Sequence, residues 1–280
     1  MLDNANIMHY NTTIIFKNSR KEEPKMKMKK ILCLVLAMLM VVTCLAGCGA
    51  KKDDNKLVMA TNAAFPPYEF MEGEEYKGID IDMAKALAEK LGKELVIENV
   101  EFGTIVAGVQ SGKFDMGVAG MTVTDERKKS VNFSDTYATG VQVVIVKKDG
   151  PIKTLDDLAG ETVKIGVQQD TTGHIYASDT PENGGYGEDH VIAYMAGADA
   201  VNALVSGKVN AVIIDNEPAK SFVAANEGLE ILPAEWVVED YAIAINKEDT
   251  QLLADINKAL AEMKADGSLK KIIDTYIPAE

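Results

Sequence analysis

Residues 116–127 read MGVAGMTVTDER, an apolar run that reaches a glycine and continues through threonines into a charged helical turn. Met116–Ala119 has the length and composition of a short buried strand. Gly120 permits a close approach of the backbone to another group. In open parallel sheets, ligands bind at such junctions, where the carboxyl ends of strands meet the starts of helices. The stretch therefore predicts an α/β fold with a binding site at this junction.

The alternation of strand and helix extends on both sides of this stretch. Short β-rich runs and segments of helical periodicity take turns along the chain, which favours layers of helices on sheets. We expect strands at residues 57–61, 94–100, 116–119, 141–146, 163–167, 191–194, 211–215 and 241–245. We expect helices at residues 82–91, 103–111, 155–158, 172–177, 199–206, 218–226, 251–265 and 268–276. Asp82 and Thr154 are the expected N-caps of two of these helices, and two such sheets facing each other would form a cleft.

The composition excludes several classes of function. The 280-residue chain is 47% hydrophobic and 26% charged, which is typical of a globular protein. Its net charge is −14, and residues 48–280 carry 22 basic and 40 acidic side chains. Nucleic acid is disfavoured as a partner, because phosphate binding needs clustered cations. The three cysteines and three histidines lack disulfide or metal-ligand spacing, so we expect no metal site and no cofactor.

The N-terminal region has the pattern of an export signal. Four lysines between residues 25 and 30 precede an apolar run from Ile31 to Ala46, which is too short for a comfortable membrane span. The run ends in the sequence LAGC, which resembles a bacterial lipobox with Cys48 as the lipidated residue. A membrane anchor with an incidental cysteine is the alternative. We expect residues 26–47 to be a lipoprotein signal peptide, residues 48–55 a polar tether and residues 1–25 a non-native upstream extension.

Two features favour the binding of an anion. Arg127 follows Gly120 and Thr122 closely, and its planar guanidinium suits a carboxylate bidentately, although most arginines are solvated surface charges. Residues 168–172, QQDTT, follow an apolar strand and open a helix. Free N–H groups and threonine hydroxyls could bind an anion there, and an ordinary N-cap by the aspartate or the first threonine is the alternative.

Two further features favour an amine and an aromatic wall. Asp215 ends the apolar strand at residues 211–215, where its carboxylate could hold an ammonium or cap the following helix. Residues 62–68, NAAFPPY, follow the first strand, and paired prolines stiffen this loop. The loop could present Phe65 to a ligand, or Phe65 and Tyr68 could simply seal the core. Together the four features point to a zwitterionic ligand.

These segments together resemble the polar amino-acid-binding proteins of ABC importers, the extracellular solute-binding proteins of family 3. The resemblance runs in order through residues 56–278. The matching stretches are residues 65–70 (FPPYEF), 78–84 (GIDIDMA), 110–115 (QSGKFD), 120–129 (GMTVTDERKK), 131–135 (VNFSD) and 166–172 (GVQQDTT).

The resemblance implies a two-lobe, type II periplasmic-binding-protein-like fold, with the ligand cleft between two α/β lobes that two hinge strands join. Lobe 1 would comprise residues 56–139 and 241–280, and lobe 2 residues 144–235. The chain would cross between the lobes near Gly140 and between residues 233 and 241.

The resemblance also implies roles for single residues. Arg127 would clamp the α-carboxylate of an amino acid, helped by the backbone near Thr122 and Thr172. Asp215 and the carbonyl of Gly120 would hold the α-ammonium.

The side chain of the ligand would meet a second group of residues. Phe65 and Phe102 would sandwich it. This chain has Asn62 where binders of basic and amide amino acids often carry aspartate, and Gln168 also falls in the side-chain pocket. Both carboxamides can form hydrogen bonds, but neither can neutralise a guanidinium. A polar amino acid is therefore expected ahead of arginine or lysine.

The predicted function is capture of a polar amino acid by clamshell closure and its delivery to an ABC permease. The protein would be a monomeric, lipid-anchored, extracytoplasmic binding protein and not an enzyme. Two alternatives stay open. An enzyme on this scaffold, such as a dehydratase of carboxylated rings, would need a general acid or base, for which Glu69, Asp80 and His174 are candidates. A sensor or adhesion lipoprotein would bind the ligand without docking on a permease.

Overall fold

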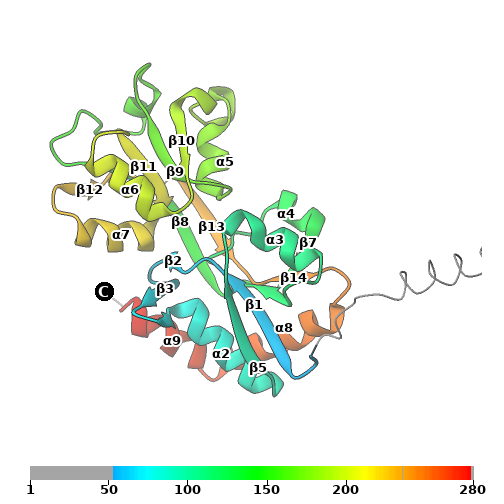
Figure 1. Cartoon of the computed structure of the whole chain (residues 1–280). Helices are drawn as coiled ribbons and strands as arrows, with labels where there is room; N and C mark the ends of the chain where they lie inside the picture. Colours follow the sequence, from blue (N-terminus) through cyan, green and yellow to red (C-terminus); the bar gives the residue numbers. More distant parts are fainter. Residues whose placement is uncertain (1–52, 235, 279–280) are drawn as a thin grey trace, which may run out of the picture. The chain divides into compact units, whose positions relative to one another are not determined.

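The structure is a computed structural model, and it describes residues 53–234 and 236–278. Two sheets flanked by helices form two lobes in this part of the chain (Figure 1). The predicted upstream extension, the signal peptide, Cys48 and most of the tether lie outside the described residues.

The first lobe is built on a five-stranded sheet with the order β5-β1-β6-β14-β7. β1 (Lys56–Thr61) pairs in parallel with β5 (Glu94–Asn99) and with β6 (Met116–Gly117). β14 (Ala244–Asn246) pairs antiparallel with β6 and with β7 (Val131–Phe133). The helices of this lobe are α2 (Ile79–Leu91), α3 (Phe102–Gln110), α4 (Asp125–Ser130), α8 (Thr250–Ala265) and α9 (Ser268–Tyr276).

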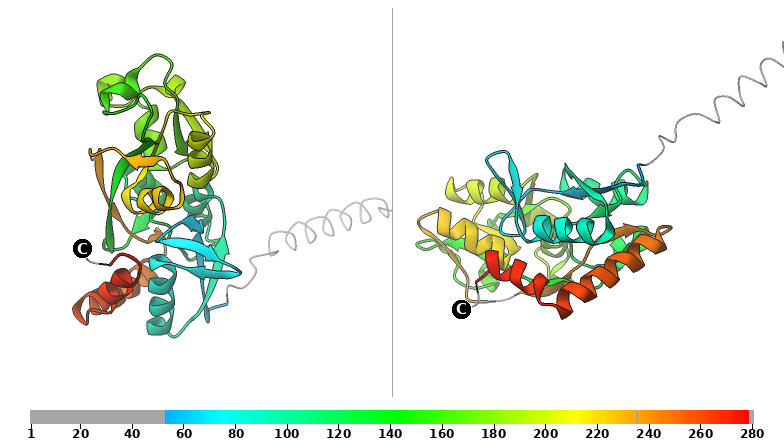
Figure 2. Two further views of the ribbon diagram at one scale, coloured as in Figure 1. Left: turned by 90° about the vertical axis from the view of Figure 1, so that its left-hand side faces the viewer. Right: turned by 90° about the horizontal axis from the view of Figure 1, so that it is seen from below.

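Helices cover both faces of this sheet, because alternate residues of β1 project to opposite sides. Leu57 and Met59 join the core that contains buried residues of α2, α8 and α9, whereas Ala60 joins the core that contains Ile105 and Val109 of α3. α8 and α9 follow one another along the chain and contact each other, and they are the orange and red helices in Figure 2. A small antiparallel sheet of β2 (Ala64–Phe65), β3 (Glu69–Glu72) and β4 (Glu75–Lys77) follows β1.

The second lobe is built on a six-stranded sheet. Three of its strands pair in parallel in the order β10 (Val191–Tyr194), β9 (Ile165–Gln168) and β11 (Ala211–Asp215), with β10 at the edge of the sheet. β8 (Ala138–Lys147) lies antiparallel beside β11, and β12 (Leu229–Ile231) pairs with the far end of β8. The helices are α5 (Thr172–Ser178), α6 (Gly197–Val205) and α7 (Asn216–Ala225), with 3₁₀ turns η1 (Asp156–Ala159), η2 (Pro181–Asn183) and η3 (Glu188–His190).

Two strands connect the lobes. β13 (Val237–Tyr241) pairs antiparallel with the first half of β8, in a register that places Val237 opposite Gln142 and Tyr241 opposite Ala138. The two strands run between the lobes in Figure 1. Tyr241 also bridges to Thr122 in the first lobe. The crossings predicted at Gly140 and between residues 233 and 241 fall on these strands, and the lobe boundaries themselves stay a prediction.

Two predicted helix starts are wrong. α2 begins at Ile79, so Asp82 lies inside its first turn, and the N-cap is Gly78. Gly78 has a φ of 122°, and a Cβ there would lie 2.1 Å from the Tyr68 carbonyl oxygen. Glycine is therefore required at the point where the chain turns into the helix.

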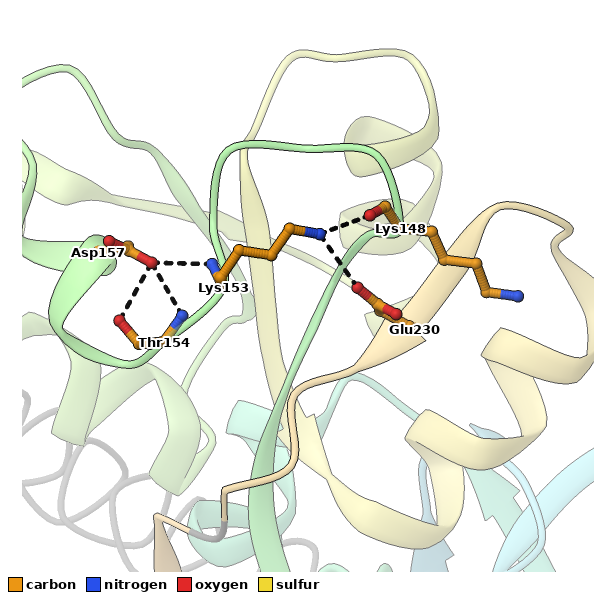
Figure 3. Close-up of polar contacts among 5 residues, drawn as sticks. All are labelled: Lys148, Lys153, Thr154, Asp157 and Glu230. Atoms are coloured by element: carbon orange, nitrogen blue, oxygen red, sulfur yellow. Dashed lines mark hydrogen bonds and ion pairs between the residues drawn. The ribbon is translucent and has the colours of Figure 1, made fainter.

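The helix predicted at 155–158 with Thr154 as its cap is a 3₁₀ turn at Asp156–Ala159 instead. The side chain of Asp157 organises this turn by accepting hydrogen bonds from the backbone N–H of Lys153 at 2.8 Å and that of Thr154 at 2.9 Å (Figure 3). The Thr154 hydroxyl donates to the same carboxylate at 3.1 Å. Thr154 is thus a donor to the turn and not its acceptor cap.

The strand predicted at 241–245 is also wrong as a single element. β13 ends at Tyr241 and β14 begins at Ala244. Between them, the N–H of Ala242 donates to the Met121 carbonyl in the first lobe. The chain therefore changes partners here, because it passes from the interlobe ladder to the sheet of the first lobe. The β2–β4 hairpins, β7 and β12 were not expected from the sequence.

Candidate functional site

A pocket of about 320 Å³, including the space at its mouth, lies between residues of both lobes. All nine residues predicted to bind ligand line it, namely Asn62, Phe65, Phe102, Gly120, Thr122, Arg127, Gln168, Thr172 and Asp215. Glu69, Ala119 and Thr171 line it as well.

Arg127 is held in place by backbone oxygens of both lobes. Thr124 caps α4 by accepting the Arg127 N–H at 3.1 Å, which places Arg127 in the first turn. Its Nη1 donates to the Thr122 carbonyl at 2.8 Å, and its Nη2 donates to the Asp170 carbonyl at 3.2 Å. The guanidinium carbon lies 5.2 Å from the centre of the Phe102 ring. Burial lowers the pKa of Arg127, but a guanidinium stays charged in proteins.

The guanidinium has five N–H donors, and two of them are used by these carbonyls. The remaining donors are available to an anion in the pocket. Arg127 therefore offers a fixed cation at one side of the site.

Two threonines face each other across the lobes beside this cation. The hydroxyls of Thr122 and Thr172 lie 3.5 Å apart and both residues are buried. The N-cap of α5 is Thr171, whose hydroxyl accepts the His174 N–H at 3.3 Å. Capping is thus done by Thr171 and not by Asp170, and Thr172, which is not used as the cap, lines the pocket.

Asp215 lines the pocket from the end of β11. It occupies the N-cap position of α7, but its side chain makes no capping hydrogen bond. Its carboxylate accepts a hydrogen bond from the Tyr241 hydroxyl instead. Burial and the neighbouring carboxyl group of Glu239 raise the pKa of Asp215 to about 7. A carboxyl group in this setting is stabilised in its ionised form by any cation that enters the pocket.

Glu69 and Asp80 form a second acidic pair, which sequence reasoning named only as possible catalytic groups. Glu69 lines the pocket, is buried, and has an Oε2 without a hydrogen-bond partner. Asp80 lies beneath the pocket, where its Oδ2 accepts the Gly120 N–H at 2.7 Å. Burial raises the pKa of Asp80 to about 6, and burial together with Asp80 raises the pKa of Glu69 well above its usual value. The signal for Glu69 was its place in the FPPYEF stretch beside a predicted aromatic wall.

Amide and aromatic side chains complete the lining. Gln168 Nε2 donates to Asn62 Oδ1 at 2.9 Å across the lobes, and Asn62 Nδ2 donates to the Val100 carbonyl at 2.8 Å. Phe65 is buried against Tyr68, with ring centres 6.1 Å apart.

Tyr68 itself packs edge-on against Tyr241 at 5.2 Å and is 2% exposed, so it seals the core as the alternative reading expected. His174 lies outside the pocket lining, where its Nδ1 accepts the Asp170 N–H at 3.2 Å. Among residues 53–234 and 236–278, no group of three or more metal-ligating side chains occurs. In the same residues, no helix is long and apolar enough to cross a bilayer.

Comparison with known proteins agrees with this architecture. The family model described as bacterial extracellular solute-binding proteins, family 3, matches residues 57–279. The arginine-binding extracellular protein ArtP of Bacillus subtilis is 33% identical over 262 residues, covering 90% of this chain and 100% of ArtP. The glutamine-binding protein GlnH of Bacillus subtilis is 31% identical, covering 90% of this chain and 100% of GlnH.

Solved structures show the same fold. An ancestral arginine-binding protein bound to arginine is 40% identical, with a TM-score of 0.73, and the match covers 79% of this chain and 98% of that chain. The arginine-, lysine-, histidine-binding protein ArtJ of Geobacillus stearothermophilus has a TM-score of 0.74 at 33% identity, with 80% of this chain and 96% of that chain covered. The match of the family model to nearly all of the described residues is decisive. The chain therefore belongs to the bacterial extracellular solute-binding proteins of family 3.

Proposed function

We propose that this chain captures a free polar amino acid in the pocket between its lobes. The single observation that carries the proposal is that the guanidinium of Arg127 and the carboxyl group of Asp215 line one pocket from different lobes. A guanidinium suits the α-carboxylate of an amino acid, and a carboxylate suits its α-ammonium. The hydroxyls of Thr122 and Thr172 add hydrogen bonds at the carboxylate end.

The lining also supports a class of ligand side chain. Phe65 and Phe102 offer apolar walls, and the carboxamides of Asn62 and Gln168 offer hydrogen bonds. Glu69 adds a buried carboxyl group with an unpartnered oxygen, which suits an N–H donor such as an amide or a guanidinium. Arginine and glutamine are the first candidates, and the names of the arginine-binding and glutamine-binding relatives support both.

Ligand capture would proceed by closure of the lobes. The bonds from Arg127 to Asp170 and from Gln168 to Asn62 join the two lobes around the pocket, so a ligand that adds further bridges favours this arrangement. Micromolar affinity corresponds to about −8 kcal/mol. Charge-assisted contacts at both ends of the ligand can supply this after ordering costs of several kcal/mol.

Delivery to an ABC permease and a lipid anchor at Cys48 complete the proposal. Relatives that carry ABC transporter names support the first part, and the LAGC sequence at residues 45–48 supports the second. The binding unit would act as a monomer, tethered outside the cytoplasm. Membrane proteins that co-purify with the ligand-loaded protein would distinguish a transport protein from a sensor that docks on no permease.

A thermal-shift screen of the twenty amino acids tests the binding proposal. A ligand that binds the folded protein raises its melting temperature by mass action. We expect a shift with arginine or glutamine, loss of that shift in Arg127→Ala and in Asp215→Asn, and retention in the control Lys128→Ala, whose side chain is exposed and pairs with Asp125. A shift with none of the twenty would contradict the proposal. Turnover of a cyclic acid would favour a dehydratase, although the family is one of binding proteins.

A further inference from the structure

Asp215 lies beside a second buried acid, Glu239, on one face of the sheet that connects the lobes. Asp215 is opposite Gln142 in the β11–β8 ladder, and Glu239 is opposite Gly140 in the β13–β8 ladder. Residues two apart on a strand share a face. The side chains of Asp215, Gln142 and Glu239 therefore project from the same face, and all three are buried.

The local packing brings these groups into contact. Gln142 Nε2 donates to Glu239 Oε2 at 2.9 Å, and the Tyr241 hydroxyl donates to Asp215. A Cβ at Gly140 would lie 2.2 Å from the Tyr241 hydroxyl and 2.8 Å from Asp215 Oδ1. Because residue 140 is a glycine, the side chains of Tyr241 and Asp215 have the space in which they meet.

Two buried acceptors in this cluster lack a donor. Neither Oε1 of Glu239 nor Oε1 of Gln142 has a hydrogen-bond partner, although both are buried. A buried acceptor without a donor is costly. Two buried carboxyl groups side by side cannot both ionise readily, and a proton on Asp215 would give Glu239 Oε1 a donor.

The charged groups around Asp215 and Glu239 do not fully neutralise these two carboxyl groups. Burial and Glu239 raise the pKa of Asp215, while Tyr241 and Gln142 lower it. Arg127, from α4, is the cation that faces the pair. The other titratable groups that interact with the two carboxyl groups are Tyr176 on α5, Glu69 on β3 and Tyr68. Glu217, at the start of α7, is paired with Lys220 at 2.7 Å.

We propose that Asp215, with Glu239 buried beside it, holds a proton in the ligand-free protein, and that the ammonium group of an amino acid releases this proton when it binds Asp215. The carboxylic O–H bond breaks, the proton passes to solvent, and the carboxylate that forms accepts the N–H groups of the ammonium. Glu239 is then a positioning residue, which acts through Asp215 and does not touch the ligand. The inference rests on the proposed function, because it requires an ammonium at Asp215.

The coupling between ligand binding and proton release fixes the direction in which the affinity changes with pH. Binding favours ionised Asp215, so the affinity is greatest at a pH above the pKa of Asp215 in the ligand-free protein. It falls by up to about tenfold for each pH unit below that pKa. Without Glu239 the pKa of Asp215 falls, so the pH dependence should flatten.

Calorimetry in buffers of different ionisation enthalpy counts the released protons. The probe is L-arginine, or the amino acid with the largest thermal shift. We expect release that approaches one proton per ligand at about pH 6 and becomes small at about pH 8, because Asp215 is then ionised before binding. Glu239→Gln should release fewer protons than the wild type at about pH 6, because burial still raises the pKa of Asp215 but the neighbouring carboxyl group no longer does. The control Asp240→Asn, an exposed acid on the neighbouring position of β13, should behave as the wild type.

A carbon-13 carboxyl titration of the ligand-free protein gives an independent reading. We expect the Asp215 resonance to titrate well above the usual aspartate range and to move down in Glu239→Gln. Binding without proton release at about pH 6, or equal release in wild type and Glu239→Gln, would overturn the inference alone. If Glu239→Gln does not fold, the wild-type proton count and titration decide it. Absence of binding by all twenty amino acids would overturn the proposed function and, with it, the release.

Discussion

Replacement of Arg127 by alanine should weaken amino-acid binding more than any other single truncation in the pocket. The guanidinium is fixed by the carbonyls of Thr122 and Asp170 at 2.8 and 3.2 Å, and it lies against the Phe102 ring. Its orientation is therefore set before a ligand arrives. In Arg127→Ala the α-carboxylate of the ligand would enter a half-enclosed pocket with no cation to meet it.

The magnitude follows from the cost of an unpaired charge. Removal of one partner from a buried ion pair costs about 3–5 kcal/mol. With tenfold in affinity for each 1.4 kcal/mol, this loss is roughly 150-fold to 4,000-fold. Arg127→Lys keeps the charge but loses the planar fork, so it should lose about 1–2 kcal/mol.

The assay is calorimetry with an amino acid and with its α-amide, which lacks the carboxylate. The amide should bind the wild type weakly, and Arg127→Ala should bind the amino acid and the amide about equally, because the interaction between the two charges is already gone. The exposed Lys128→Ala serves as the matched control. An Arg127→Ala protein that folds and binds the amino acid within about threefold of the wild type would refute the role given to Arg127.

Four further predictions concern other parts of the account. Asp215→Asn should weaken binding of an amino acid by about 3 kcal/mol but hardly affect its deaminated analogue, as calorimetry would show; equal losses would contradict the ammonium site. Because burial raises the pKa of Asp215 to about 7 and of Asp80 to about 6, the folded ligand-free protein binds more protons than the unfolded chain between about pH 4 and those values. Its free energy of unfolding should therefore fall as the pH rises from about 5 to 8, measured by urea denaturation; a rise would show that these acids are not the dominant groups. Gly140→Ala should destabilise the fold by about 1–3 kcal/mol, because the new Cβ would lie 2.2 Å from the Tyr241 hydroxyl, and an unchanged urea midpoint would argue against this packing. Cys48→Ser should move the exported protein from the membrane fraction to the soluble fraction, and retention in the membrane fraction would contradict lipidation at Cys48.

The sequence was informative where local chemistry and packing agree. Residues 191–194, 211–215 and 268–276 have the predicted bounds, and at 211–215 the apolar run is bounded by Asn210 and ends in Asp215. The nine predicted ligand-binding residues meet in one pocket because the carboxyl ends of β1, β5, β6, β9 and β11 all contribute to its lining. Composition also draws attention to Arg127, because the chain contains only one other arginine, Arg20.

The sequence was less informative about features that tertiary contacts determine. The break between β13 and β14 comes from a change of strand partner at Ala242. The residue pattern at 241–245 does not indicate this break. The unpaired Oε2 of Glu69 depends on burial beside Asp80, which lies 11 positions along the chain. Asp215 lies on β11 and Glu239 on β13, and each of these strands pairs with β8. Such contacts arise from strand order, which local propensity does not encode.

A crystal structure of the protein with L-arginine or L-glutamine would show directly whether Arg127 and Asp215 hold the two ends of the ligand. We predict one amino acid between the lobes, with its α-carboxylate within hydrogen-bond distance of the Arg127 guanidinium and its α-ammonium within hydrogen-bond distance of the Asp215 carboxylate. A ligand bound with those two ends reversed, or bound away from the pocket between these two side chains, would contradict it.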